Sequence, residues 1–169
     1  VRRLLFVPVN NLGFEVRLTP TGRDTTERYR IAGEPALFAH NGLPCNRPPW
    51  GRLVAVNVDK GEIAWSVSTT TGPDDFGNSS YGPPLATGGG LVFHGGTYFP
   101  VLRIHDATTG ELIGKLDLPA GVHGGPIAFK LRPDSREFIV VAAGGHDGLG
   151  SPKGDYVMAW ALPRSALAR

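Results

Sequence analysis

The chain has 169 residues, enough for a single domain. Its 24 glycines and 15 prolines interrupt helices, while a hydrophobic content of 41% with eight phenylalanines argues against disorder. The net charge is +2 and the basic residues are scattered, so nucleic acid is not an expected partner. Cys45 is the single cysteine, which excludes an internal disulfide, and we expect it to be a small buried residue.

Short apolar and β-branched runs, each bounded by turn residues, predict strands along most of the chain. In chain order they are Leu4–Val9, Phe14–Leu18, Leu53–Val58, Ile63–Ser68, Pro84–Thr87, Leu91–His94, Leu102–Asp106, Leu112–Leu116, Pro126–Phe129, Phe138–Ala142 and Tyr156–Ala161. No stretch keeps a 3.6-residue apolar period for three turns, so no helix is predicted. Residues 19–50, which are dense in proline and glycine, are predicted to form an irregular excursion between repeats.

A turn motif occurs twice, 49 residues apart. Asn57 and Gly61 in the first copy correspond to Asp106 and Gly110 in the second. A period in the forties that is built from short strands is typical of β-propeller blades. We therefore predict an all-β fold, a partial β-propeller of four-stranded antiparallel blades.

The predicted strands are too few to close a propeller. We expect one propeller segment over 1–169, with a blade at 51–116, a C-terminal blade at 117–163 and a tail at 164–169. Four strands per blade give about three blades, whereas propellers close with roughly four to eight. Two apolar sheet faces would then stay uncovered, so we expect a homo-oligomer or a piece of a longer polypeptide rather than a free monomer. The absence of an initiator Met, with a predicted strand at the first residues, also favours a longer polypeptide.

The first copy of the turn motif continues to a tryptophan. Ala55, Asn57, Gly61 and Trp65 have the spacing Ala-x-Asn-x-x-x-Gly-x-x-x-Trp. This spacing would place the indole at the rim of a blade, where its face stacks on the next blade and its N–H meets a backbone acceptor. The motif resembles the tryptophan-docking motif of the quinoprotein dehydrogenases, which usually have Asp where this chain has Asn57. Gly114 replaces the tryptophan in the second copy, so we expect a weaker contact between blades there.

Five further stretches extend this resemblance over nearly the whole chain. They are Pro8–Leu12, Gly42–Gly51, Leu116–Gly121, Ala142–His146 and Gly154–Pro163. Together they are similar to the C-terminal third of the glucose/quinate/shikimate-type quinoprotein dehydrogenases, whose cofactor is pyrroloquinoline quinone (PQQ).

The resemblance implies an eight-bladed periplasmic propeller that holds PQQ with Ca²⁺ or Mg²⁺. Such an enzyme oxidises a hydroxyl of a sugar or cyclitol, such as glucose or quinate, and passes the electrons to ubiquinone. Some members are anchored in the inner membrane by upstream helices. The resemblance places the catalytic aspartate, the quinone contacts and the metal ligands upstream of this chain. We therefore expect no catalytic or metal-binding residue here, no tight cofactor binding, and no activity of the chain alone.

Two histidines are the candidate substrate-binding residues. His146 follows Gly144-Gly145 and opens a glycine-dense loop, which lets a backbone approach a ligand closely. The resemblance places the matching histidine at the mouth of the pocket, where it would hydrogen-bond a substrate hydroxyl. His123, before Gly124-Gly125, is the second candidate. For each, the alternative is a histidine that is satisfied by its own loop or half in water.

A different class of function stays open on the sequence alone. A glycine-rich set of blades also suits a non-catalytic propeller module that recognises carbohydrate or protein at its loops. The chain contains no complete catalytic set, which is compatible with this alternative. Saturable carbohydrate binding without quinone would distinguish it from a dehydrogenase.

Overall fold

The computed structural model describes residues 3–22, 26–33, 36–70 and 76–162. The elements are β1 (Leu4–Asn10), β2 (Leu18–Pro20), β3 (Tyr29–Ile31), β4 (Gly51–Asn57), β5 (Glu62–Ser68), β6 (Leu85–Ala86), β7 (Leu91–His94), β8 (Val101–Asp106), β9 (Leu112–Asp117), β10 (Ile127–Lys130), β11 (Glu137–Ala143), the 3-10 helix η1 (Asp147–Leu149) and β12 (Tyr156–Ala161). Within these residues, no helix has the length and apolar character needed to cross a membrane.

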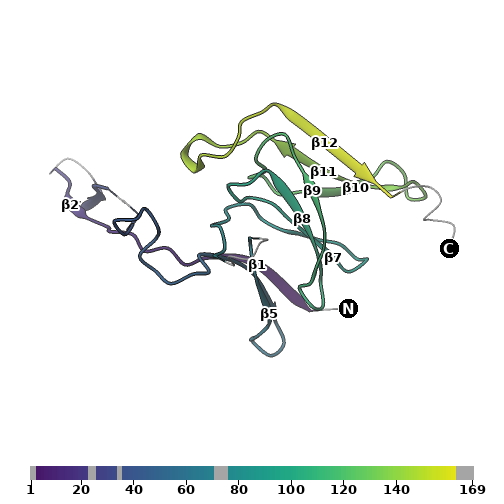
Figure 1. Cartoon of the computed structure of the whole chain (residues 1–169), viewed down its shortest axis with the longest axis horizontal. Helices are drawn as coiled ribbons and strands as arrows, with labels where there is room; N and C mark the ends of the chain where they lie inside the picture. The colour runs from purple at the N-terminus through teal and green to yellow at the C-terminus, as the bar shows by residue number, and fades with distance from the viewer. Residues whose placement is uncertain (1–2, 23–25, 34–35, 71–75, 163–169) are drawn as a thin grey trace.

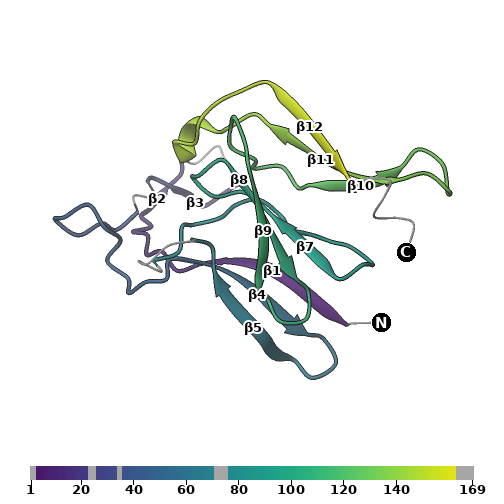
Figure 2. The ribbon, with the colours of Figure 1, turned by 45° about the vertical axis from the view of Figure 1, so that its right-hand side comes forward.

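Three antiparallel sheets lie one behind another like the blades of a fan (Figures 1 and 2). The first sheet is β1–β4–β5, the second is β6–β7–β8–β9 and the third is β10–β11–β12. A separate hairpin, β2–β3, lies away from all three sheets at the left of Figure 1. The prediction of an all-β fold made of antiparallel propeller-type sheets is confirmed.

The segment between β1 and β4 differs from its prediction. Phe14–Leu18 is not a strand, because Phe14 makes only an isolated bridge to Ala36 and β2 starts at Leu18. Phe14, Val16 and Leu18 are each about half exposed, since none of the three sheets covers this segment. The excursion also contains a strand that was not predicted, β3, which pairs with β2.

The grouping of strands also differs from the prediction. Residues 51–116 contribute to two sheets, because β4 and β5 join the first sheet while β6 to β9 form the second. The first sheet is completed by β1, which pairs with β4 across the whole excursion, from Leu4↔Asn57 to Asn10↔Gly51. The predicted tail at 164–169 lies outside the described residues.

Apolar side chains fill both spaces between the sheets. Because successive strand residues point to opposite faces, Val92 of β7 faces the first sheet while Phe93 faces the third. The cluster between the first and second sheets is Leu53, Ala55, Trp65, Val92 and Ala107. The cluster between the second and third sheets is Phe93, Leu102, Leu118, Ala120, Val122, Val141 and Ala143.

The strand order brings five connections to the same end of the fan. They join β1 to β4, β5 to β6, β7 to β8, β9 to β10 and β11 to β12 (Figure 2). We call this end the loop face, and the short hairpin turns lie at the opposite end. Residues far apart in the sequence therefore meet at the loop face.

Candidate functional site

The residues of the docking motif lie between the first and second sheets. Trp65 is 9% exposed, and its indole N–H donates to the carbonyl oxygen of Ala107 in the turn after β8, at 3.1 Å. The ring covers Gly110, where a Cβ would lie 2.7 Å from indole atoms Cδ2 and Cε3. Ala55 pairs with Trp65 in the β4–β5 register and is fully buried.

Both copies of the turn motif use the same hydrogen bonds. The Asn57 Oδ1 atom accepts from the backbone N–H groups two and three residues later, at 3.0 and 3.2 Å. The Asp106 Oδ1 atom does the same at 2.7 and 2.9 Å. The N–H of Gly61 donates to the carbonyl oxygen of Asn57, and the N–H of Gly110 donates to that of Asp106. Asparagine thus replaces aspartate here without loss of the turn.

At the loop face, the structure brings His123 and His146 together. Their ring centroids are 5.8 Å apart, with the planes at 66°. His123 comes from the β9–β10 connection and is partly buried, whereas His146 comes from the β11–β12 connection and is exposed. The two candidate residues therefore form one site, although 22 residues separate them in the sequence.

Ser151 joins the two histidines and was not predicted from the sequence. Its Oγ atom lies 2.7 Å from His123 Nε2 and accepts a hydrogen bond from the backbone N–H of His146 at 2.9 Å. Ser151 is 5% exposed. Gly121 makes this approach possible, because a Cβ there would lie 2.6 Å from Ser151 Oγ and 3.0 Å from His123 Nε2. The contact spans two loops, so no local sequence pattern indicates it.

Backbone hydrogen bonds clamp the two loops of this site. The N–H of Gly145 donates to the carbonyl oxygen of Gly121 at 2.8 Å. The N–H of Gly121 donates to the carbonyl oxygen of Pro152 at 2.9 Å. Lys153 and Asp147 form an exposed ion pair within the β11–β12 connection. The position of His146 is therefore set by the backbone of two connections rather than by its own side chain.

His123 is held neutral. Burial lowers its pKa from the ordinary value of 6.5, the neighbouring His146 lowers it further, and the Gly96 backbone opposes both effects. Its buried Nδ1 atom has no partner with full hydrogen-bond geometry among the described residues. In the neutral imidazole, Nε2 can either accept from or donate to the Ser151 hydroxyl, according to which nitrogen carries the proton.

A second polar cluster lies behind the loop face. The Nε2 atom of His94 is 2.8 Å from Ser80 Oγ, which also donates to the carbonyl oxygen of Gly95 at 3.1 Å. The first sheet is tied to the same serine, because Asn10 Nδ2 donates to its carbonyl oxygen at 3.0 Å. His94 is fully buried, and burial, followed by the nearby Arg103 and His105, lowers its pKa to about 3. This cluster stays uncharged at neutral pH and is suited to holding the loops in place.

Two other sequence expectations concern the single residues Cys45 and Gly114. Cys45 is exposed rather than buried, because it lies in the excursion that no sheet covers. Trp50 is partly buried, stacks on Phe76 at 5.5 Å between ring centroids, and donates its indole N–H to the carbonyl oxygen of Asn46 at 2.7 Å. Gly114, which replaces the second tryptophan, lies beside Ile104 in the second sheet. Between the second and third sheets, Phe93 belongs to the buried cluster and the partly buried Trp160 of β12 packs against it.

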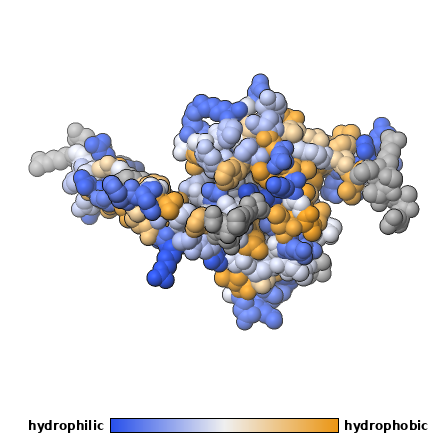
Figure 3. All heavy atoms as spheres, viewed as in Figure 1, coloured by the Kyte–Doolittle hydropathy of each residue, from blue (hydrophilic) through white to orange (hydrophobic). Residues whose placement is uncertain are grey.

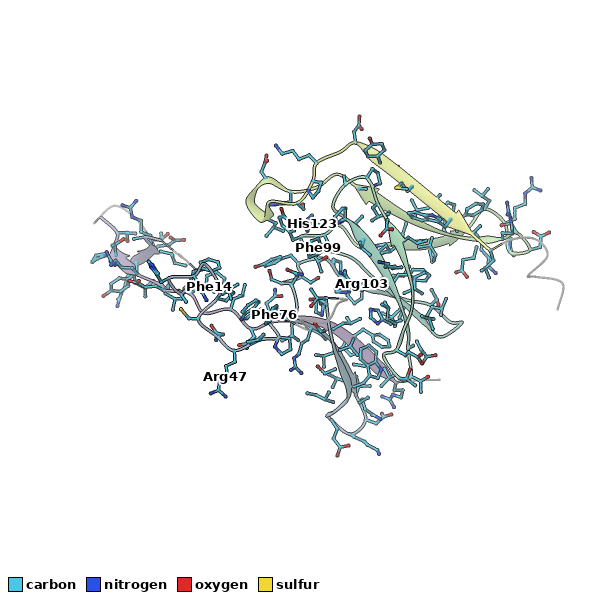
Figure 4. All side chains as sticks on the ribbon, viewed as in Figure 1. Phe14, Arg47, Phe76, Phe99, Arg103 and His123 are labelled. Carbon is cyan, nitrogen blue, oxygen red and sulfur yellow. The ribbon has the colours of Figure 1, made fainter. Side chains whose placement is uncertain are left out.

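Among its described residues, the loop face has hydrogen-bond donors and acceptors and no preformed metal site. Over the described ranges, no three side chains of His, Cys, Asp or Glu come together as metal ligands. The exposed imidazole of His146 can donate to and accept from a ligand hydroxyl, and Ser151 and His123 fix its place (Figure 4 labels His123). The arrangement is therefore suited to recognising a hydroxyl group rather than to binding a cation.

Comparison with known proteins places most of the chain in one family. Residues 2–139 match the PQQ family model described as "Glucose/ethanol/alcohol dehydrogenase, beta-propeller domain". A probable quinate dehydrogenase (quinone) from Xanthomonas campestris pv. juglandis is 38% identical over 72% of this chain, and the quinoprotein glucose dehydrogenase of Escherichia coli K12 is 31% identical over 72%. In both cases the match spans 17% of the relative's length.

The structural comparison gives the same architecture. A europium-containing methanol dehydrogenase superposes on 84% of this chain with a TM-score of 0.61 and 25% identity, over 23% of its own length. The quinohemoprotein alcohol dehydrogenase from Comamonas testosteroni, at 21% identity, shares the fold over 95% of this chain, also with a TM-score of 0.61. The docking geometry of Trp65, the fan of sheets and the match over residues 2–139 lead to one conclusion: the chain belongs to the β-propeller family of the PQQ-dependent quinoprotein dehydrogenases.

Proposed function

We propose that this chain is the C-terminal part of a periplasmic PQQ-dependent dehydrogenase that oxidises a hydroxyl of a sugar or polyol and passes the electrons to ubiquinone. The observation that carries the proposal is the pair of histidines at the loop face, in which His146 is exposed and His123 is fixed by Ser151. Relatives named for quinate, glucose and glycerol support this substrate class, because all three compounds carry several hydroxyl groups.

In this proposal His146 binds and orients the substrate. Its imidazole donates to or accepts from one hydroxyl, while neutral His123 offers no competing positive charge beside it. PQQ, when bound with its metal ion in the complete enzyme, would accept the two electrons released as the hydroxyl carbon becomes a carbonyl. No three metal ligands gather among the described residues, so we assign no step through the metal or the quinone to them. The chain alone is expected to be inactive.

A chimera tests the proposal. This chain would replace the matching segment of the E. coli quinoprotein glucose dehydrogenase, and dye reduction would be followed with glucose, quinate and glycerol in the presence of PQQ and Ca²⁺. We expect turnover of at least one of these compounds. His146→Ala should lower kcat/KM about tenfold or more, the size of one lost hydrogen bond to the substrate. The matched control is His40→Ala, because His40 is exposed in the excursion.

The contrary results are equally specific. A chimera that binds PQQ but oxidises none of the three compounds would contradict the proposal. If the chain alone also bound glucose saturably without quinone, the non-catalytic carbohydrate-binding module would be the better description. Full turnover by the isolated chain with PQQ and Ca²⁺ would show that the catalytic base lies within it.

A further inference from the structure

A buried arginine faces a cavity between the first and second sheets. The cavity has a volume of about 440 Å³ and is lined by Thr70, Phe99, Pro100, Val101, Arg103, Asp117 and Leu118. Figure 4 shows Phe99 and Arg103 close together in this region. Its size is within the range of small-molecule sites.

Among the described residues, no carboxylate is paired with Arg103, although Asp117 lies in the cavity wall. Arg103 is 2% exposed. Its Nη1 atom donates to Thr97 Oγ1 at 3.2 Å, while its buried Nε atom has no partner. A buried guanidinium with one neutral acceptor is costly, because it has left water without a compensating anion.

The groups packed around Arg103 do not supply that anion. His94 pairs with Arg103 across β7 and β8, and His105 follows on the same face of β8. Both are buried, and burial lowers the pKa of each, so both are neutral at pH 7. Lys115, opposite Arg103 on β9, is a further cation. Of the residues that the structure describes, the one cation that lines the cavity is therefore Arg103, and the one carboxylate of the lining, Asp117, is exposed.

The rest of the lining restricts the chemistry of a ligand. Phe99, Pro100, Val101 and Leu118 form apolar walls, so the body of the ligand should be apolar. Asp117 is exposed and adds one negative charge to the wall, which disfavours a multiply charged anion such as phosphate. A planar carboxylate can accept from two N–H groups of a guanidinium together, which is the strongest arrangement for that group.

We propose that this cavity is a binding site for a small organic monocarboxylate with an apolar body, held by the guanidinium of Arg103. The carboxylate lies against Arg103, and the apolar body lies against Phe99 and Leu118. This site goes beyond the proposed dehydrogenase function and does not depend on it.

Benzoate is the probe that tests the site in the full chain, with benzamide as its uncharged counterpart. Isothermal titration calorimetry should give saturable benzoate binding in the millimolar range, and benzamide should bind about tenfold more weakly, because it lacks the charge-assisted pair. Chemical-shift changes at the Arg103 Nε–H signal should follow the same titration.

Variants separate this site from non-specific binding. Arg103→Gln should weaken benzoate binding about tenfold or more. Arg103→Lys keeps the charge but not the planar fork, so its affinity for benzoate should lie between those of the natural chain and Arg103→Gln. This variant remains usable if the glutamine variant does not fold. Asp117→Asn should tighten binding about threefold, because a repulsive charge is removed. The matched control is Arg52→Gln, since Arg52 is an exposed residue on β4 whose Nη1 donates to Ser66 Oγ.

Several results would overturn the proposal. Equal binding of benzoate and benzamide would show an apolar cavity without an anion site. Displacement of benzoate by equimolar inorganic phosphate would contradict the monocarboxylate assignment. An equal loss of binding in Arg52→Gln, or no saturation at about 50 mM benzoate, would show that Arg103 does not hold the ligand.

Discussion

At the scale of single residues, His94 links protonation to stability. It is fully buried, and its pKa is about 3 in the fold against 6.5 ordinarily. Below pH 6.5 the unfolded chain binds a proton that the folded chain does not, so stability is complete above that pH. It falls as the pH drops toward 3, by about 1.4 kcal/mol per pH unit for one proton.

His94→Gln tests this linkage. Glutamine can keep a hydrogen bond to Ser80 and does not titrate, so the variant should lose stability less steeply between pH 6 and pH 4 than the natural chain does. Urea unfolding at a series of pH values measures both slopes. His40→Gln, at an exposed position, should keep the natural slope. Equal slopes for His94→Gln and the natural chain would show that His94 is protonated in the fold.

Single residues also show what the sequence can and cannot reveal about the site. His123 and His146 could be proposed one by one, because each adjoins a glycine pair at a strand end. Ser151 could not be proposed, because its role depends on a 2.7 Å contact between two loops. The burial of Arg103 beside a cavity could not be proposed for the same reason, since it arises from strand register and from the packing of two sheets.

At the scale of elements, the two turn glycines form a matched pair. Gly61 and Gly110 both have positive φ, +68° and +77°, but only Gly110 is covered by Trp65. Gly61→Ala should cost about 1 kcal/mol of stability from the backbone conformation alone. Gly110→Ala should cost about 1–3 kcal/mol more, because its methyl group would meet the indole. Chemical denaturation of both variants measures the difference, and equal losses would mean that the Trp65 contact adds nothing.

The elements also explain where strand prediction succeeds. Two strands have the predicted bounds, β7 (Leu91–His94) and β12 (Tyr156–Ala161). One face of each strand packs in a core cluster, and turn residues flank its ends. The prediction at Phe14–Leu18 is wrong because its apolar alternation has no sheet to pack against. The pairing of β1 with β4 was beyond any local pattern, since residues 11–50, which include the excursion, separate the two strands.

At the scale of the whole molecule, the fan of three sheets ends in an uncovered apolar face. On the third sheet, Ile127, Phe129 and Val157 share the side that points away from the second sheet, with exposures of 57%, 40% and 77%. Figure 3 shows hydrophobic surface in the region of β10 to β12. At about 25 cal/mol per Å², a few hundred Å² of such surface in water costs several kcal/mol, which is comparable to the stability of a domain.

This face predicts that the isolated chain associates. Light scattering across a dilution series should give a mass above 18.0 kDa at micromolar concentration. Val157→Lys should raise the dissociation constant about tenfold or more, because it places a charge in the centre of the contact. Leu131→Lys is the matched control, since Leu131 is 75% exposed but lies in the β10–β11 turn rather than on the sheet face. A monomer with a cooperative melt at the same concentrations would contradict the prediction, and would mean that the third sheet is stable without a neighbour on its outer face.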